Sequence, residues 1–156
     1  MPMKPIVSLA ALALLASTPA AAQVTQADAA AMKAADEQAC TFARAAGAGL
    51  EAIVDTFKAQ AVKFPAASRD GLIGQINAQL RGYTFTDAAT YRVYELPGYV
   101  RLYAVPVATN GKMLFFALTY ERYGGEVVLT NFQYADKLEN ALKAPYVTDP
   151  VTVSCP

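Results

Sequence analysis

Apolar and polar residues alternate along most of residues 99–134, and this is the clearest pattern in the chain. A period of two is typical of β-strands, and the stretch is rich in Val, Leu, Phe, Tyr and Thr, which suit a pleated surface. Asn-Gly at 110–111 and Gly-Gly at 124–125 interrupt it with residues that tolerate the positive φ angles of two-residue hairpin turns. The pattern predicts three antiparallel strands joined by two tight turns.

Two-residue loops would also fix the register of both hairpins. In the first hairpin, Tyr103 is expected to face Leu118. In the second, Tyr120 is expected to face Leu129, and Leu118 to face Asn131. A β-bulge in any strand would exchange the two faces of the sheet beyond that point.

Counting from these pairs assigns the side chains of residues 99–134 to two faces. The first face, which is expected to meet the core, collects Arg101, Tyr103, Val105, Val107, Leu114, Phe116, Leu118, Tyr120, Arg122, Val127, Leu129, Asn131 and Gln133. The second face collects Val100, Leu102, Ala104, Met113, Phe115, Ala117, Thr119, Glu121, Glu126, Val128, Thr130, Phe132 and Tyr134. This second face is too apolar for an ordinary hydrated surface, so we expect a partner subunit, a terminal segment or a ligand to cover it.

Helical spacing of apolar residues precedes the strands. Helices are expected over residues 26–46, about 50–62 and about 69–80, and a strand over 90–96. Pro97-Gly98 is a type II turn signal, and a two-residue loop there would place Glu95 on the second face. Residues 135–142 are expected to form a short helix, and residues 143–156 an extended surface tail.

The first 22 residues have the features of an export signal. Lys4 precedes an apolar run over 6–16, which is too short to span a bilayer, and small residues at 20–22 precede Gln23. A buried N-terminal helix is the alternative. The export reading predicts a single domain over 23–156 that is periplasmic or secreted by a bacterium. No later stretch is long and apolar enough for a membrane helix.

The two cysteines, Cys40 and Cys155, both lie in the expected mature domain. In an exported chain, two cysteines most simply form one disulfide bond with each other. Two free thiols or an intermolecular bridge are the alternatives. Their spacing matches no metal or redox motif.

Helices followed by strands predict an α+β domain, with N-terminal helices packed on a curved four-stranded antiparallel meander. This order, with the hairpin FFALTYERYGGEVVLTNFQY near the end, resembles the nuclear transport factor 2-like, or ketosteroid isomerase-like, superfamily of the cystatin-type fold. Small exported bacterial members of unknown function look similar around this hairpin. The resemblance implies a cone-shaped domain with a pocket between helices and sheet, and frequent dimers through the sheet. It implies no single activity.

Several kinds of chemistry lack their usual residues. The chain contains no histidine, the commonest general base near neutral pH and a frequent metal ligand. No glycine-rich phosphate loop, zinc-ligand pattern or dense acidic loop occurs, so no cofactor and no metal are expected. The 13 basic residues balance 13 acidic residues, which together with export argues against a nucleic-acid partner.

Five polar residues on the expected core face form a candidate ligand site: Arg101, Tyr103, Tyr120, Asn131 and Gln133. A few polar groups among apolar neighbours are typical of a small-molecule pocket. The alternative is structural: the tyrosine hydroxyls reach solvent at the rim, and the amides bond helix ends.

The sequence therefore favours a non-catalytic role, in which the exported domain binds a protein partner or a second copy through its second sheet face. A small-molecule binding protein with a pocket between helices and sheet is the alternative. An enzyme is the least favoured class, because the expected core face of residues 99–134 carries no carboxylate that could act as a base.

Overall fold

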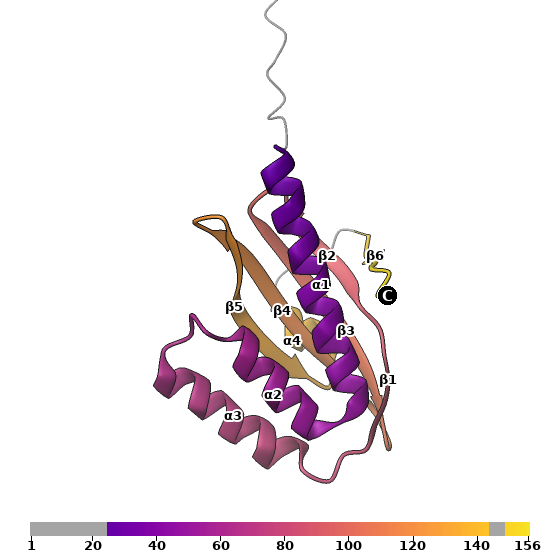
Figure 1. Ribbon diagram of the computed structural model, residues 1–156. Coiled ribbons are helices and arrows are strands. Elements are labelled where there is room, and N and C mark those ends of the chain that lie inside the picture. Colours follow the sequence, from indigo (N-terminus) through magenta and orange to yellow (C-terminus); the bar gives the residue numbers. More distant parts are fainter. Residues whose placement is uncertain (1–24, 144–148) are drawn as a thin grey trace, which may run out of the picture.

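Three helices come first in the chain and an antiparallel sheet follows them (Figure 1). The computed structural model describes residues 25–143 and 149–156. Its elements are α1 (Gln26–Ala48), α2 (Leu50–Gln60), α3 (Ala66–Leu80), β1 (Phe85–Ala88), β2 (Tyr91–Leu96), β3 (Val100–Thr109), β4 (Met113–Tyr123), β5 (Glu126–Ala135), α4 (Leu138–Leu142) and β6 (Val151–Thr152). The predicted α+β class, with helices N-terminal to the sheet, is confirmed.

The described sheet has six strands, not the expected four. Its order is β5-β4-β3-β2-β6, and β1 pairs with the far end of β3. The two added strands are short: β1 has four residues and β6 has two, so neither shows a clear alternation in the sequence. As a result, β5 lies at one end of the sheet order and the chain's last strand at the other.

Helix α1 begins and ends at local sequence signals. Thr25 and Asp28 form a capping box at its start, and Gly49 ends it with a φ of 124°. Close to this end, a Cβ on Gly47 would lie 2.9 Å from the Thr86 carbonyl oxygen. A glycine and buried alanines therefore let α1 lie close against the sheet.

The hairpin turns set the register at both ends of β4. Tyr103 pairs with Leu118 and Tyr120 with Leu129, as predicted. The type II turn also forms, since Gly98 has a φ of 80° and the Tyr99 amide donates to the Leu96 carbonyl at 3.0 Å.

The loop at this type II turn is one residue longer than expected. Leu96 pairs with Val100, so three residues lie between the paired positions, and Glu95 pairs with Arg101. The extra residue turns the Glu95 side chain toward the face that carries Arg101, so its placement on the second face was wrong.

A β-bulge in β5 changes the faces of its second half. Thr119 pairs with Asn131 while its neighbour Tyr120 pairs with Leu129, which leaves Thr130 as the extra residue. The predicted Leu118–Asn131 pair was therefore wrong, and Leu118 pairs with Phe132 instead. Beyond the bulge, Phe132 turns into the helix-facing core, and Asn131 and Gln133 turn to the opposite face.

The core between helices and sheet is filled with large side chains. Phe57 and Phe132 have ring centroids 4.6 Å apart, and Phe42 packs edge-on against both Phe116 and Phe132. All four rings come from different elements, so this aromatic cluster joins α1 and α2 to β4 and β5.

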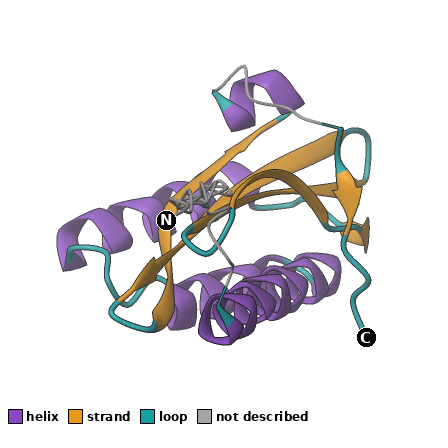
Figure 2. Ribbon diagram, turned by 90° about the horizontal axis from the view of Figure 1, so that it is seen from above, coloured by secondary structure: helices purple, strands orange, loops and turns teal. Residues whose placement is uncertain are grey.

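The second sheet face is covered in part by the chain's own C-terminal segment. Figure 2 shows α4 alone on the side of the sheet opposite α1. Ala141 and Leu142 of α4 pack with Val93, Ala104 and Ala117. Of the three expected covers for this face, a terminal segment is the one that the structure shows.

The predicted disulfide bond joins Cys40 to Cys155 and so attaches the tail to α1. The expected export signal at 1–22 lies outside the described residues. Among the helices in the described ranges, none is both long and apolar enough to cross a membrane.

Candidate functional site

Arg101 and Tyr103, two of the predicted ligand-binding residues, are held by α1 and β2. The Tyr103 hydroxyl donates to Asp36 Oδ1 at 2.6 Å. Arg101 Nη1 donates to Asp36 Oδ2 and to the Met32 carbonyl, both at 2.8 Å, and Arg101 Nη2 donates to Glu95 Oε1 at 2.7 Å. The Arg101 side chain is 12% exposed. These groups satisfy one another, so this cluster fixes α1 on the sheet.

Tyr120, the third predicted residue, is also bonded within the protein. Its hydroxyl donates to Gln60 Oε1 at 2.7 Å, and Gln60 Nε2 donates to the Gln38 carbonyl at 2.8 Å. The ring of Tyr120 packs edge-on against that of Tyr103, at a centroid distance of 5.7 Å. Tyr120 therefore links the sheet to α1 and α2.

The two buried tyrosines predict a loss of stability above about pH 10. Burial raises the pKa of Tyr103 and of Tyr120 above the ordinary value, and the bond from Tyr103 to Asp36 raises the Tyr103 pKa further. In the unfolded chain both would ionise near pH 10, so their stabilising contribution is complete below that pH and is lost as the pH rises above it. The expected slope is about 1.4 kcal/mol per pH unit for each tyrosine.

Urea unfolding at pH values from 8 to 11.5 would measure this slope. Tyr120→Phe should reduce the slope by about 1.4 kcal/mol per pH unit. Tyr99→Phe, at an exposed position, should leave the slope unchanged. An equal slope in the wild type and in Tyr120→Phe would contradict the prediction.

Asn131 and Gln133, the remaining predicted residues, do not join the other three. The bulge at Thr130 places them on the opposite face of β5. Gln133 Nε2 lies 3.4 Å from Asn131 Oδ1, but Gln133 Oε1 is buried and has no hydrogen-bond partner within the described part of the chain. A buried acceptor without a donor costs stability.

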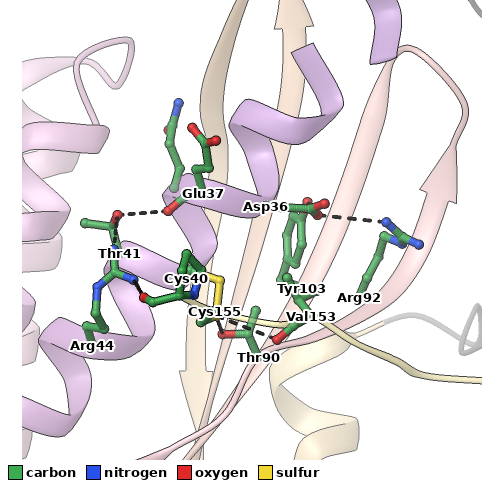
Figure 3. The surroundings of a disulfide bond; sticks show 12 residues. Asp36, Glu37, Cys40, Thr41, Arg44, Thr90, Arg92, Tyr103, Val153 and Cys155 are labelled. Atoms are coloured by element: carbon green, nitrogen blue, oxygen red, sulfur yellow. Dashed lines mark hydrogen bonds and ion pairs between the residues drawn. A yellow bond between two sulfur atoms is a disulfide. The ribbon is translucent and has the colours of Figure 1, made fainter. Parts of the chain in front are cut away.

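A hollow of about 410 Å³ lies beside the disulfide bond, between α1 and the tail (Figure 3). Arg92 Nη1 lies 3.9 Å from Asp36 Oδ1 in its wall. The Val153 amide donates to the Thr90 carbonyl at 2.9 Å, and Arg44 Nη1 donates to the Pro156 carbonyl at 2.9 Å. The tail itself builds one wall of this hollow. Its lining carries two basic and two acidic side chains, so it favours no ligand of one charge.

The outer edge of β5 offers a different kind of site. Within the described chain, β5 pairs with β4 and with no strand on its other side. Two hollows lie along it. The first hollow, about 490 Å³, is lined by Lys63, Phe64, Pro65, Tyr123, Val128, Leu129 and Thr130. The second hollow, about 270 Å³, is lined by Leu72, Gln75, Gln79, Phe132, Gln133, Tyr134, Asn140 and Lys143. We call β5's outer edge and these two hollows the edge site.

The first hollow is mostly apolar and its mouth is exposed. Phe64 and Pro65 come from the loop between α2 and α3, and Tyr123, at its mouth, is 69% exposed. Lys63 Nζ lies 3.7 Å from Glu126 Oε2 and forms a charged rim. An apolar floor with a polar rim is the usual composition of a docking site for a large apolar side chain.

The sequence pattern did not reveal the edge site. Phe64 and Pro65 stand in a loop without periodicity, so nothing in the sequence connected them to β5. The one available signal was Tyr123, an aromatic residue directly before a Gly-Gly turn, where a side chain is expected to lie at the surface.

Comparisons with known proteins give no match: no family model, curated protein or solved structure is similar to this chain. The resemblance to the nuclear transport factor 2-like superfamily therefore gains no support from them. Among the described residues, no group of three or more Cys, Asp or Glu side chains is placed to hold a metal ion. The function must be argued from the edge site itself.

Proposed function

We propose that this chain is a non-catalytic binding domain that docks another polypeptide at its edge site. The observation that carries the proposal is the ten-residue strand β5, which ends the sheet beside an apolar hollow of about 490 Å³. An apolar hollow with a polar rim can receive a large side chain of a partner, which is a common anchor of a docked polypeptide. The docking surface therefore differs from the second sheet face expected from the sequence.

Two features of the described residues support this change of surface. On the second face, Phe115 packs against the cluster that contains Ala141 and Leu142 of α4. By contrast, Tyr123, which lines the first hollow, is 69% exposed, and Val62, which precedes Lys63 in the chain, is 61% exposed. Exposed apolar side chains around a hollow are more typical of an interaction site than of an idle surface.

The non-catalytic and exported parts of the proposal rest on separate observations. Asp36, which accepts from Tyr103, and Glu95 both bind Arg101, so neither lies alone in an apolar pocket as a general base would. The Cys40–Cys155 bond and the signal-like residues 1–22 are compatible with a periplasmic or secreted protein. An intact bridge in protein isolated from the exported fraction would test the location.

A matched pair of tyrosine variants tests the docking site. We expect Tyr123→Ala to weaken binding of a selected polypeptide about tenfold or more, because a tyrosine at an interface often contributes this much. Tyr99→Ala should leave binding unchanged within about twofold, because Tyr99 is 64% exposed but does not line the first hollow. The probe is a peptide selected from a displayed library of random dodecapeptides, with affinity measured by calorimetry. Equal affinities for both variants would contradict the proposal.

A small-molecule binder is the second candidate, and the amide side chains that line the second hollow favour it. Such a ligand would form hydrogen bonds with these amides. The filled core between helices and sheet argues against the helix–sheet pocket predicted from the sequence. Bound small-molecule mass in a native mass spectrum, lost in Gln133→Leu, would support this candidate.

A further inference from the structure

We infer that the partner at the edge site is a second copy of this chain, related by a two-fold axis, and that each copy inserts Tyr123 into the first hollow of the other. This inference rests on the proposed function and specifies its partner. Three observations carry it: the buried strand behind the hollow, an exposed aromatic side chain beside an apolar hollow, and a rim with one charge of each sign.

The first hollow is suited to a side chain rather than to an added strand. Leu129 and Val128, the β5 residues that line it, are 0% and 5% exposed. The bulge at Thr130 also interrupts the regular spacing of β5 at this point. An added strand needs accessible backbone groups at regular intervals. The partner is therefore expected to be anchored by a side chain that enters the hollow.

Tyr123 is the protruding part of this surface. It is the last residue of β4, and its side chain is exposed. The tip of the β4–β5 hairpin extends beyond α2 and α3 (Figure 1), so a partner as large as a second copy can approach it. A tyrosine offers a large apolar area at a low cost in conformational entropy, which makes it a frequent anchor of protein interfaces.

The first hollow is the complementary, receiving part of the same surface. Its volume of about 490 Å³ is within the range that holds a small ligand, so it has room for one tyrosine ring. Phe64, Pro65 and Val128 give it apolar walls, and the Phe64 ring packs edge-on against that of Phe57 at a centroid distance of 5.8 Å. A protrusion and a matching hollow on one surface are what a two-fold interface requires.

The position of Tyr123 indicates where the axis passes. Tyr123 lines the mouth of the hollow in its own chain. A two-fold axis beside this residue brings the two Tyr123 rings together, so that each ring contributes to the walls of both hollows. An aromatic pair adds to the stabilisation that comes from burial alone. Each hollow is therefore completed by the partner copy.

The rim of the first hollow is complementary to itself. Lys63 Nζ and Glu126 Oε2 lie 3.7 Å apart, and their side chains are 57% and 73% exposed. An exposed ion pair contributes little within one chain, so its members can exchange partners at little cost. Across a two-fold axis, Lys63 of each copy faces the partner's Glu126, because such an interface repeats every contact. A partner with a strong charge of one sign would face one like charge at this rim.

Sedimentation of the purified protein from about 1 µM to about 500 µM gives the first test, and we expect a reversible dimer with a micromolar dissociation constant. Tyr123→Ala should raise that constant about a hundredfold, since a loss of about tenfold occurs once in each copy. Met113→Ala is the matched control. Met113 is an exposed apolar residue at the other end of β4, so the constant should change less than about twofold.

Exchange of the rim charges gives the second test. Lys63→Glu and Glu126→Lys should each weaken self-association about tenfold, because like charges then face each other across the axis. An equimolar mixture of the two variants should form heterodimers, since one chain then has an acidic rim and the other a basic rim. Native mass spectrometry, with one variant labelled with heavy nitrogen, would count the species. A purely structural role of these side chains would give no recovery on mixing.

The contrary results separate this inference from the proposed function. If the protein stays monomeric while Tyr123→Ala still weakens binding of the selected dodecapeptide, the second copy is wrong and docking at the edge site stands. A dimer that Tyr123→Ala leaves intact, or that shows no preference for heterodimers on mixing the charge variants, would overturn the two-fold arrangement. If Tyr123→Ala affects neither self-association nor peptide binding, both proposals are wrong.

Discussion

Phe132→Ala is expected to lower the free energy of unfolding by about 3–5 kcal/mol, the usual cost of removing a buried phenylalanine. Phe132 is 4% exposed. Its ring centroid lies 4.6 Å from that of Phe57, 5.6 Å from that of Phe42 and 6.0 Å from that of Phe116. Because these rings come from two helices and a neighbouring strand, removing Phe132 leaves a cavity that no single side chain can fill by changing rotamer.

Phe115→Ala is the matched control. Phe115 lies on the other face of the sheet, where it is half-buried against the cluster that contains Ala141 and Leu142. Its removal should cost about 1–2 kcal/mol, since less apolar surface is exposed and α4 can shift toward the gap. Denaturant unfolding of both variants would measure the difference. Without the bulge, Phe132 and Phe115 would share a face, and a cost for Phe132 no greater than that for Phe115 would show that the bulge is absent.

The regular parts of the sheet were predictable from sequence because turn chemistry is local. Asn-Gly at 110–111 and Gly-Gly at 124–125 determine where each hairpin reverses, and the pairs near those turns follow by counting. The bulge at Thr130 was not predictable. Threonine suits a regular strand as well as a bulge, and no glycine or proline marks the position. Because this extra residue was not anticipated, the prediction assigned Phe132, Asn131 and Gln133 to the wrong faces of the sheet.

The three-residue loop after Leu96 was likewise not predictable in length. Pro97 and Gly98 correctly indicate a type II turn, but the turn type alone does not decide whether Tyr99 pairs with Leu96 or extends the loop. That single residue moves Glu95 to the side of Arg101. The sequence therefore did not predict the ion pair between Glu95 and Arg101, although both residues could be assigned to adjacent strands.

The candidate site was only partly predictable because its decisive contacts are between distant residues. Arg101, Tyr103 and Tyr120 could be placed on the core face, but their partners Asp36 and Gln60 come from α1 and α2. From the sequence, Asp36 is expected to be an ordinary solvent-exposed charge on a helix. Its role becomes evident only from the packing of α1 on the sheet. The same limit applies to the edge site, whose first hollow is completed by a loop that packs beside a strand more than fifty residues later in the chain.

Helix α4 shows how a correctly predicted element can still mislead about a surface. The short helix after residue 135 was expected, and it forms at 138–142. Its position over Ala104 and Ala117 depends on how the chain turns after β5, which no local signal determines. Once α4 covers this face, the apolar residues that had indicated a partner become part of a second small core. The argument for an interaction site then rests on the first hollow, beside β5.

The disulfide bond is expected to contribute about as much stability as the Phe132 ring. Cys40 and Cys155 are 115 residues apart, so the bridge closes a loop that spans most of the described chain. In the chain-entropy model such a loop restricts the unfolded state by about 4–5 kcal/mol, and measured losses on removing a native bridge are about 2–5 kcal/mol. By contrast, β6 supplies only two residues to the sheet. The bridge should therefore act chiefly through the unfolded state.

Unfolding of the Cys40→Ala/Cys155→Ala double variant in urea separates these two contributions. We expect a loss of about 2–5 kcal/mol together with a larger denaturant slope, because an unfolded chain without the bridge is more expanded and exposes more surface. Val153→Ala is the control for the tail's own packing, since Val153 bonds the Thr90 carbonyl only through its backbone and packs on the core only in part. It should cost less than about 1 kcal/mol and leave the slope unchanged. A loss in the double variant no larger than that in Val153→Ala would show that the bridge merely holds the tail in place.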